Sequence, residues 1–577
     1  MQTPPHADDT VDFVSASRVN DWLAGFQNGT SNTGPSVEEL QSSVSWRVTR
    51  PLRAAKLRER LQAFRTSGTI RLAPVEAAPT GIDIAREALH SRLAAIAAVV
   101  LAPGHEGDGS LEQTLAALTS TALEDESSAH LWLLMTAVSG CMPDDAFLLG
   151  LRRDLQGVAG SEASYKILQH STVWAVRHGS HLRRIEVVSD RPVVYVNFTA
   201  RHGYNSGVQR VTRGLVSEWD GAREFALAAL THDGTGLREL DERETDRVVR
   251  WNAASAAQAA VAVDESQLAL VVPWNTVMFV PEIPDSAGSV TLRALARFSG
   301  NRTIAIGYDT IPVVSATYLD SSVRLDFSRY LSMLKYFDEV VAISQSAANE
   351  FEGFRAAVRT QGLKGASVCF VALPGEPIQA SPRAPSVDRV APMVLSVSNN
   401  EPRKNQMAVV FAAEMLWREG FEFSLVVAGG AGPVGFTHVS DAAAALRAKG
   451  RDIEILRDNS EDDLADAYSS ARFSVFVSFH EGYGLPITES LAAGTPVITT
   501  CYGSAGEIAA LGGCLTVDPR NDDEIVESMR RLLASDDELA RLESDIASRA
   551  QSTAADYADS IWRILADKAD DGVTAHA

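Results

Sequence analysis

Residues 478–498 read SFHEGYGLPITESLAAGTPVI and follow an apolar run from Phe473 to Val477. The apolar run predicts a buried strand, and the small and apolar residues after Pro486 predict a helix. Two glycines between them, Gly482 and Gly484, allow positive φ and close approach of the backbone. Amide groups at the helix start can then face an anionic or hydroxyl-rich ligand. We therefore predict a strand–loop–helix unit whose loop contacts a ligand.

Two carboxylates flank this turn, because Glu481 lies in the loop and Glu489 falls within the predicted helix. A bare pair of acids at this spacing would be explained better by a glycine-rich turn with solvated carboxylates. The full string is more specific, since it resembles the Glu-x7-Glu signature of family 4 (group 1) retaining glycosyltransferases of the GT-B fold. The resemblance covers about residues 190–567. It implies an enzyme that transfers a sugar from a nucleotide-diphosphate donor.

The composition is that of an ordinary folded protein with several domains. The chain has 577 residues, of which 45% are hydrophobic and 22% charged, and its net charge is −22. This charge argues against sequence-nonspecific binding of nucleic acid, which needs clustered Lys and Arg, and against broad adhesion to anionic lipid. A basic stretch at residues 47–65 is the local exception.

The four cysteines show neither metal-ligand spacing nor a disulfide framework, so we expect reduced core thiols. They are Cys141, Cys369, Cys501 and Cys514. No apolar window is long enough to cross a bilayer, and the first residues lack the pattern of a secretory signal. We expect a cytoplasmic protein, with a peripheral position at the inner membrane face left open.

The patterns divide the chain into four segments. Residues 1–66 predict a flexible N-terminus with a basic amphipathic segment, and residues 67–188 an all-α accessory domain. Residues 189–385 and 386–577 predict the two Rossmann-like halves of a GT-B fold, facing each other across a cleft and ending in a helix that crosses back to the first half. Within the first segment, residues 45–53 resemble a stretch found beside catalytic domains in bacterial surface-polysaccharide glycosyltransferases. Whether this segment docks on the protein itself, on a partner or on a membrane stays open, as does the oligomeric state.

The first α/β half contributes a glycine and an acid to the predicted site. A strand at residues 191–198 leads into a loop around Gly207, which resembles the Thr-Gly-Ile-Gln-Arg-Val loop of one family 4 subgroup. That resemblance implies that Gly207 lies near the donor diphosphate, although a plain strand–helix turn would need no ligand. Relatives usually carry His-Asp where this chain has Tyr308-Asp309. Asp309 could orient an acceptor hydroxyl, and a helix or turn cap explains it equally well.

The second half contains an adjacent cation pair, Arg403-Lys404, which follows a predicted strand that begins near Met393. Arg binds oxygens bidentately and Lys acts as a point charge, so the two together suit a diphosphate that gains charge as its glycosidic bond breaks. The pair resembles the Glu-x-Arg-Lys-Asn element of the family, which implies phosphate ligands. A solvated pair at a helix start is the alternative.

The resemblance assigns the remaining roles. Glu489 would accept hydrogen bonds from the ribose hydroxyls, and Glu481 would orient the sugar or stabilise an oxocarbenium-like state. No cofactor and no metal are expected, because basic residues neutralise the diphosphate. Sugar hydroxyls and the distal phosphate would be held by the backbone around Gly482, Tyr483, Gly484 and Leu485.

We therefore expect a retaining hexosyltransferase that acts on a glycan, lipid-linked or protein acceptor in the synthesis of a bacterial surface polysaccharide or glycoconjugate. The alternative is a catalytically degenerate GT-B module that serves as a scaffold through its helical domain, which Tyr308 and the additional N-terminal residues would suit. A nucleotide-sugar epimerase is a poorer third reading. The sequence leaves the sugar, the base, the acceptor and the linkage undetermined.

Overall fold

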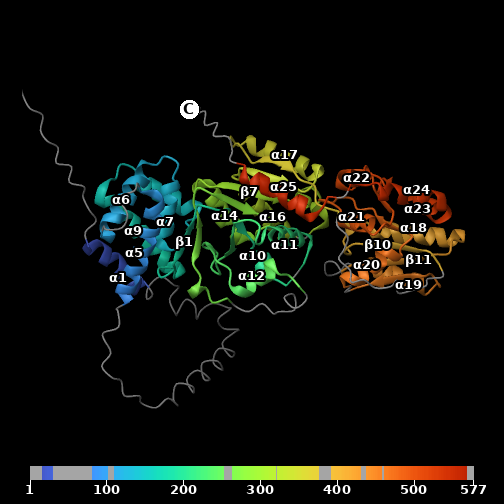
Figure 1. Ribbon diagram of the computed structural model, residues 1–577, viewed down its shortest axis with the longest axis horizontal. Helices are drawn as coiled ribbons and strands as arrows, with labels where there is room; N and C mark the ends of the chain where they lie inside the picture. Colours follow the sequence, from blue (N-terminus) through green and yellow to red (C-terminus); the bar gives the residue numbers. More distant parts are fainter. Residues whose placement is uncertain are drawn as a thin grey trace, which may run out of the picture.

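The computed structural model describes residues 16–29, 81–101, 110–203, 205–252, 263–319, 321–375, 391–430, 437–457, 460–550 and 552–567. They form a helical domain and two α/β domains in a row (Figure 1). This is the GT-B architecture with a helical N-terminal region, as the sequence predicts. The basic stretch at 47–65 and the predicted boundary between the two α/β halves lie outside the described residues.

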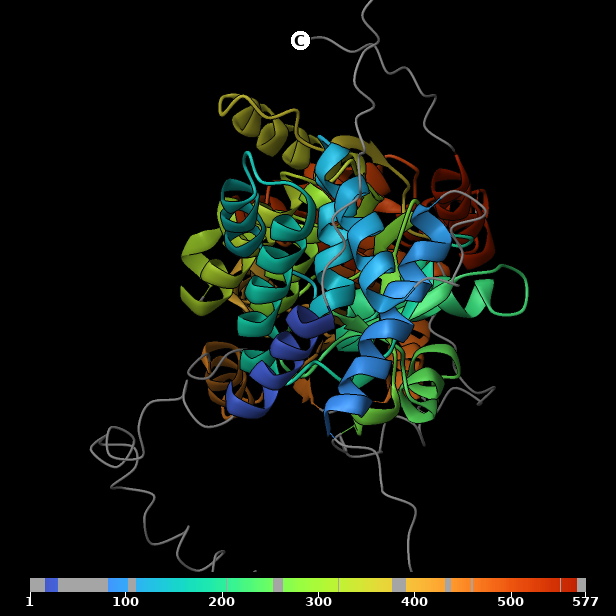
Figure 2. The same cartoon turned by 90° about the vertical axis from the view of Figure 1, so that its left-hand side faces the viewer.

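The helical domain is built around α7, whose residues are almost all buried. Its neighbours pack around it on several sides, as Figure 2 shows from the end of the molecule. Local signals start and stop these helices: Ser110 and Gln113 form a capping box before α6, and Gly140 ends α7 in the left-handed conformation. The helices are α1 (Ala16–Gly29), α5 (Gly81–Val100), α6 (Leu111–Glu124), α7 (Ala129–Ser139), α8 (Asp145–Asp154) and α9 (Gly160–His178).

The first α/β domain holds a nine-stranded sheet in the order β1-β5-β4-β3-β2-β6-β7-β8-β9, parallel except for β4. The strands are β1 (Ile185–Val188), β2 (Val193–Tyr195), β3 (Ala226–Leu230), β4 (Leu237–Arg238), β5 (Leu270–Pro273), β6 (Val277–Val280), β7 (Arg302–Gly307), β8 (Glu339–Ala342) and β9 (Ser367–Phe370). Since β1 pairs with β5, the sheet begins before residue 189, the predicted domain boundary. A four-residue strand gave no pattern that separates it from the end of the helical region.

Strand β2 is shorter than the predicted 191–198, because helix α10 (Asn197–Arg201) begins shortly after it. The buried carboxylate of Glu282 accepts hydrogen bonds from the amides of Phe198 (2.6 Å) and Thr199 (3.1 Å) and so caps this helix. The other helices of the domain are α11 (Gly207–Trp219), α12 (Glu242–Val249), α14 (Ser286–Phe298), α15 (Ile311–Val314), α16 (Ser321–Leu334) and α17 (Gln345–Arg359), with 3-10 turns η1 (Glu265–Gln267) and η2 (Ala316–Tyr318).

The second α/β domain has a fully parallel six-stranded sheet in the order β12-β11-β10-β13-β14-β15. The strands are β10 (Met393–Val397), β11 (Ser424–Ala428), β12 (Ile453–Leu456), β13 (Phe473–Phe476), β14 (Val497–Thr500) and β15 (Cys514–Val517). Strand order reverses between β10 and β13, and in such doubly wound sheets ligands bind at the carboxyl ends of the strands at this point. The helices are η3 (Pro402–Lys404), α18 (Gln406–Glu419), α19 (His438–Arg447), α20 (Glu461–Ser470), α21 (Leu485–Ala492), α22 (Gly503–Ala509), α23 (Asp522–Ala534) and α24 (Asp536–Ala547).

The last helix, α25 (Ala554–Ala566), lies across the first α/β domain, far from the strands that precede it in sequence (Figure 1). The indole nitrogen of Trp219 on α11 donates to the carbonyl of Ala558 at 3.2 Å, and the rings of Trp219 and Trp562 meet edge to face. The chain therefore crosses the boundary between the two α/β domains twice.

The apolar core follows the same division. One continuous cluster runs through the helical domain, the first α/β domain and α25, whereas the second α/β domain has separate clusters of its own. Among the described helices, none combines the length and the hydropathy of a transmembrane span.

Candidate active site

The candidate site lies where β10 and β13 end, on either side of the strand-order reversal. After β10 the chain turns through η3, which carries Arg403 and Lys404. The turn is closed by Asn405 in the left-handed conformation, and the side-chain amide of Asn405 donates to the carbonyl of Pro519 at 2.8 Å. After β13 the chain enters the glycine-rich loop, and the amide of Phe479 bonds to the carbonyl of Arg403 at 2.8 Å. A backbone hydrogen bond thus joins two segments that are distant in sequence.

Glu481 joins the two cations in one cluster. The Lys404 ammonium lies 2.7 Å from one of its carboxylate oxygens and 2.9 Å from the other, and the Arg403 guanidinium lies 3.2 Å away. Arg403 also pairs with Glu401 at 3.0 Å. Burial by itself disfavours the charged carboxylate, but Lys404 and Arg403 outweigh it and hold the pKa of Glu481 below its usual range. The structure therefore brings together Arg403, Lys404 and Glu481, and with Glu401 the charges of the cluster balance.

The glycine-rich loop presses against the first α/β domain. A Cβ at Gly482 would lie 2.5 Å from the carbonyl oxygen of Tyr308, so no larger residue fits without moving the backbone. The hydroxyl of Ser344 donates to the carbonyl of Gly482 at 2.8 Å, and the hydroxyl of Tyr483 to that of Leu373 at 2.5 Å. Gly484 has φ of 125°, which an L side chain rarely adopts. The loop that the sequence assigns to ligand contact is also the contact between the two domains.

Glu489 lies on α21 and is 5% exposed. One carboxylate oxygen accepts a hydrogen bond from the Arg210 guanidinium at 2.8 Å, and the other from the Tyr468 hydroxyl at 3.0 Å. Arg210 belongs to α11 of the first domain, so this pair spans the domain boundary. Gly207 starts the same helix, and a Cβ there would lie 3.3 Å from the side chain of Leu485. The starts of α11 and α21 therefore face each other across the boundary.

Tyr308 and Asp309 occupy the end of β7. The buried Tyr308 hydroxyl donates to the carbonyl of Pro281 at 2.6 Å, and burial raises the pKa of Tyr308. One carboxylate oxygen of Asp309 accepts from the amide of Ile311 at 3.0 Å, the turn-capping geometry that the sequence left open. Burial raises the pKa of Asp309 to about 6.

A histidine that the sequence argument passed over links the domains beside this cluster. One ring nitrogen of His480 lies 2.6 Å from a carboxylate oxygen of Glu350, and the other lies 2.8 Å from the Ser315 hydroxyl. The other oxygen of Glu350 accepts from the amide of Thr310 at 2.7 Å. Burial alone would lower the pKa of His480, but the bond to Glu350 raises it above its usual value.

Arg210 and Tyr468 were also missed. Arg210 follows Gly207 by three residues, and His480 directly precedes Glu481, yet neither carries a local sequence signal of its partner. Tyr468 precedes Glu489 by twenty-one residues and reaches it only because α20 and α21 pack together.

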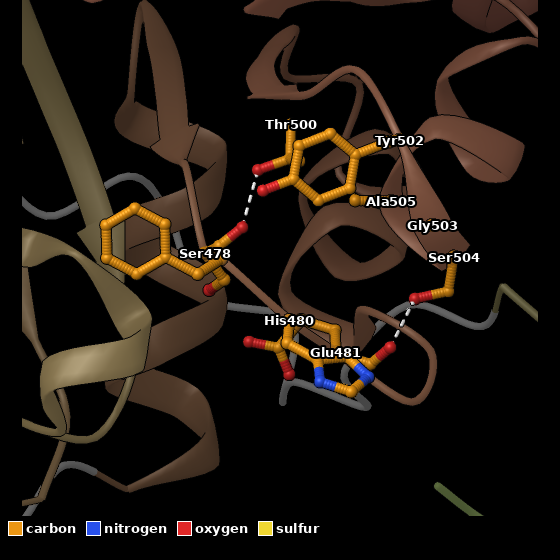
Figure 3. A pocket seen from close by; sticks show the side chains of 9 residues that line it. Ser478, His480, Glu481, Thr500, Tyr502, Gly503, Ser504 and Ala505 are labelled. Carbon is orange, nitrogen blue, oxygen red and sulfur yellow. Dashed lines mark hydrogen bonds between the residues drawn. The ribbon is translucent and has the colours of Figure 1, made fainter. Parts of the chain in front are cut away.

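Two small cavities lie at the ends of the strands of this domain, and neither is lined by Arg403 or Lys404. One lies between the ends of β13 and β14 and holds about 240 Å³ of empty space, part of it open to solvent. Figure 3 shows Ser478 and Glu481 on one wall, with their carbonyls bonded to the Thr500 and Ser504 hydroxyls on the other. The second lies at the ends of β10, β11 and β12 and is likewise partly open to solvent, and Asn400, Gly430 and Arg457 contribute to its wall. Within the described part of the chain, no group of three His, Cys, Asp or Glu side chains is arranged to hold a metal ion.

Residues 379–549 match the family model "Glycosyl transferases group 1". The match falls on the second α/β domain and covers both the cation pair and the glycine-rich loop.

Curated proteins show a longer but weaker similarity. The chain is 24% identical over 367 residues to the serotype-specific mannosyltransferase WbdA of Escherichia coli, which is 60% of this chain and 41% of that protein. It is 31% identical over 146 residues to the O-antigen chain mannosyltransferase B of Escherichia coli, or 25% of this chain and 37% of that protein. The chain thus spans about two fifths of the length of these relatives.

Among solved structures, the Anabaena protein Alr3699/HepE in complex with UDP and glucose overlaps 65% of this chain and 99% of its own. Its TM-score is 0.45 and its sequence identity 12%, too loose a likeness to bear on function.

Proposed function

We propose that this protein is a retaining glycosyltransferase that moves a hexose from a nucleotide-diphosphate donor to an acceptor hydroxyl. The observation that carries the proposal is the meeting of Arg403, Lys404 and Glu481 at the strand-order reversal of the domain that matches the group 1 family. Doubly wound sheets bind ligands at this position, and a cation pair there suits a diphosphate.

The donor would lie along the carboxyl ends of β10 and β13. Glu489, with lone pairs left on both oxygens, would accept hydrogen bonds from the ribose hydroxyls. The amides of residues 482–485 would hold the sugar hydroxyls and the distal phosphate, with Gly207 approaching from the first domain. Because Glu481 occupies both cations in the free protein, an incoming diphosphate must share them with it or displace it.

The cation pair would then do most of the catalytic work. As the bond between the anomeric carbon and the diphosphate oxygen breaks, Arg403 and Lys404 stabilise the charge that develops on the leaving group. Losing one such preorganised donor costs about 3–4 kcal/mol in well-studied enzymes. The acceptor oxygen bonds to the anomeric carbon from the leaving-group face, and its proton passes to a phosphate oxygen. Glu481, released from Lys404, would face the positively charged sugar carbon.

On the acceptor side, Asp309 lies at the end of β7 beside the loop that carries Gly482. We propose that its carboxyl orients the acceptor hydroxyl. The two relatives reported above are named a serotype-specific mannosyltransferase and an O-antigen chain mannosyltransferase, which makes a mannosyl donor and a surface-polysaccharide acceptor the first pair to test. Such work would take place in the cytoplasm, at the inner membrane face where a lipid-linked acceptor is exposed.

The test is incubation with GDP-, UDP- and dTDP-linked hexoses, with and without an acceptor, for the wild type and an Arg403→Ala/Lys404→Ala variant. We expect donor hydrolysis or transfer by the wild type and a loss of about 10³-fold or more in the variant. Arg418→Ala, which removes an exposed arginine of the same domain, is the matched control and should keep full activity.

Other outcomes point elsewhere. Binding of a nucleotide sugar without turnover would support the scaffold reading, and interconversion of the donor would support an epimerase. Equal rates for the wild type and the double variant would overturn the proposed mechanism. Since the cations neutralise the diphosphate, a chelator such as EDTA should leave turnover unchanged.

A further inference from the structure

Arg210 reaches out of the first α/β domain to a carboxylate of the second. Its side chain is 39% exposed, yet its guanidinium is fixed on Glu489 at 2.8 Å, and Glu489 itself is 5% exposed. Because a large part of the Arg210 side chain contacts solvent, water could solvate its charge without a buried partner in another domain. The contact therefore matters more for the buried carboxylate of Glu489 than for the guanidinium of Arg210.

The helix that carries Arg210 is held rigidly. Arg213, the next arginine along α11, ties this helix to its neighbours: its guanidinium donates to Asn205 at 2.7 Å and to the carbonyl of His202 at 3.2 Å in the preceding loop, and to the carbonyl of Arg247 on α12 at 3.1 Å. Burial lowers the pKa of Arg213 to about 10. Because α11 cannot shift freely on its own domain, Arg210 can meet Glu489 only while the two domains stay in this arrangement.

Glu489 has one partner from each domain. An ionised carboxylate can accept about four hydrogen bonds. Tyr468 and Arg210 use two of these positions, one on each oxygen, and two remain, the number that the 2′- and 3′-hydroxyls of a ribose require. With Tyr468 alone, the carboxylate plane could turn about its last bond, because that torsion is broad.

We propose that Arg210 is a positioning residue that fixes the plane of the Glu489 carboxylate for a ribose diol, so that the ribose is recognised only when the two domains are closed. The inference rests on the proposed function, in which Glu489 receives the ribose. It adds that part of the recognition of the nucleotide comes from the first domain.

The test compares a nucleoside diphosphate with its 2′-deoxy counterpart, using the base that the wild type binds best. Dissociation constants are measured by calorimetry for the wild type, Arg210→Met, Arg210→Lys and Tyr468→Phe. We expect the wild type to prefer the ribonucleotide, and Arg210→Met to lose about tenfold of that preference, since the carboxylate then loses a charge-assisted hydrogen bond that fixes its plane. Arg210→Lys should restore part of it, and Tyr468→Phe should reduce it as Arg210→Met does.

Arg223→Met is the matched control. Arg223 also forms a cross-element ion pair, with Asp559 of α25 at 3.1 Å, but lies away from Glu489. This variant should keep both dissociation constants of the wild type.

The outcomes separate the inference from its premise. If Arg210→Met weakens the binding of both nucleotides equally, Arg210 only holds the two domains together and the inference is overturned. An unchanged preference in Arg210→Met overturns it as well, while the proposed function stands. If the wild type binds neither nucleotide, the proposed function itself fails, and with it the inference.

Discussion

Asp309 is the residue whose ionisation the fold changes most plainly within the candidate site. Its pKa rises from an ordinary value of 3.8 to about 6, first because of burial and despite the amide of Ile311 and the nearby Arg403. The unfolded chain therefore releases this proton at lower pH than the folded one does. Between about pH 4 and pH 6 stability falls as the pH rises, and above that range the cost is constant.

Asp309→Asn should remove this cost. The asparagine side chain can still accept the bond from Ile311 but carries no charge, so we expect the variant to be more stable than the wild type by about 1–3 kcal/mol above pH 7 and nearly equal to it at pH 4. Denaturant unfolding at several pH values measures this. A variant that is less stable at pH 8 would contradict it. If Asp309 orients the acceptor, the same change lowers kcat/KM for the acceptor and leaves donor binding unchanged.

His480 and Glu350 give a pH dependence in a different window. The folded pKa of His480 is raised from 6.5, so its contribution is fully present below that value and is lost as the pH rises through the raised pKa. The folded pKa of Glu350 is lowered from 4.5, mainly by His480 and Thr310 against the effect of burial, so its contribution is lost as the pH falls through the lowered pKa. The other groups that face His480 are Asp309 and Glu481, and both favour its charged form.

We therefore expect His480→Gln to destabilise the protein most between about pH 4.5 and 6.5, and less as the pH rises through the raised pKa of His480. Thermal unfolding followed across pH 4–9 measures the difference. His90→Gln, a change at an exposed histidine of α5, is the control for removing a histidine elsewhere in the fold. A constant difference at all pH values would mean that the pair is not charged in the fold.

At the scale of elements, the glycine-rich loop has to do two things at once: it ends β13 and it meets the first domain at van der Waals distance. Gly482→Ala would place a Cβ 2.5 Å from the Tyr308 carbonyl and 3.0 Å from the Asp309 side chain, so the domains must separate or the loop must shift. We expect transfer activity to fall about tenfold or more, because misplacements of about 1 Å cost on the order of a hundredfold in rate.

Gly353→Ala provides the comparison for Gly482→Ala. Gly353 lies within α17, and a Cβ there would meet no atom within 4 Å. Alanine in a helix interior is favoured over glycine by about 0.5–1 kcal/mol, so this variant should be slightly more stable and fully active. If Gly482→Ala were equally harmless, the close approach at the boundary would carry no function.

At the scale of the whole molecule, the apolar clusters divide the chain differently from its sequence order. The helical domain, the first α/β domain and α25 share one core, while the second α/β domain has its own. Ion pairs reinforce the first unit, since Asp145 on α8 contacts Arg293 at 3.4 Å and Arg297 at 3.0 Å. The helical domain is therefore part of a larger folding unit.

Calorimetry should accordingly resolve two unfolding transitions. A nucleoside diphosphate at a hundred times its Kd should stabilise the transition of the second α/β domain by about 2.7 kcal/mol. Asp145→Ala should lower only the other transition, since its partners belong to the first unit. A single transition that shifts as a whole, both with the nucleotide and in Asp145→Ala, would show that the two cores unfold together as one unit.

The sequence by itself determined the local structure: the helical character of the region before the first sheet, the buried strands that begin at Phe473 and near Met393, and the placement of Arg403-Lys404 and Glu481 at strand ends. These follow from periodicity and from backbone chemistry within a few residues. Short strands such as Val277–Val280 escaped it, because four apolar residues carry too little pattern.

Only the tertiary structure decided which groups meet. Arg210 and Glu489 are 279 residues apart in sequence, and His480 and Glu350 are 130 apart. Their pairing depends on how two separately folded sheets dock. The residues next to a side chain in sequence do not indicate a partner that this docking brings to it. For the same reason, the sequence could name Glu489 and Asp309 as candidates but could not show that one is anchored from the other domain and that burial alters the ionisation of the other.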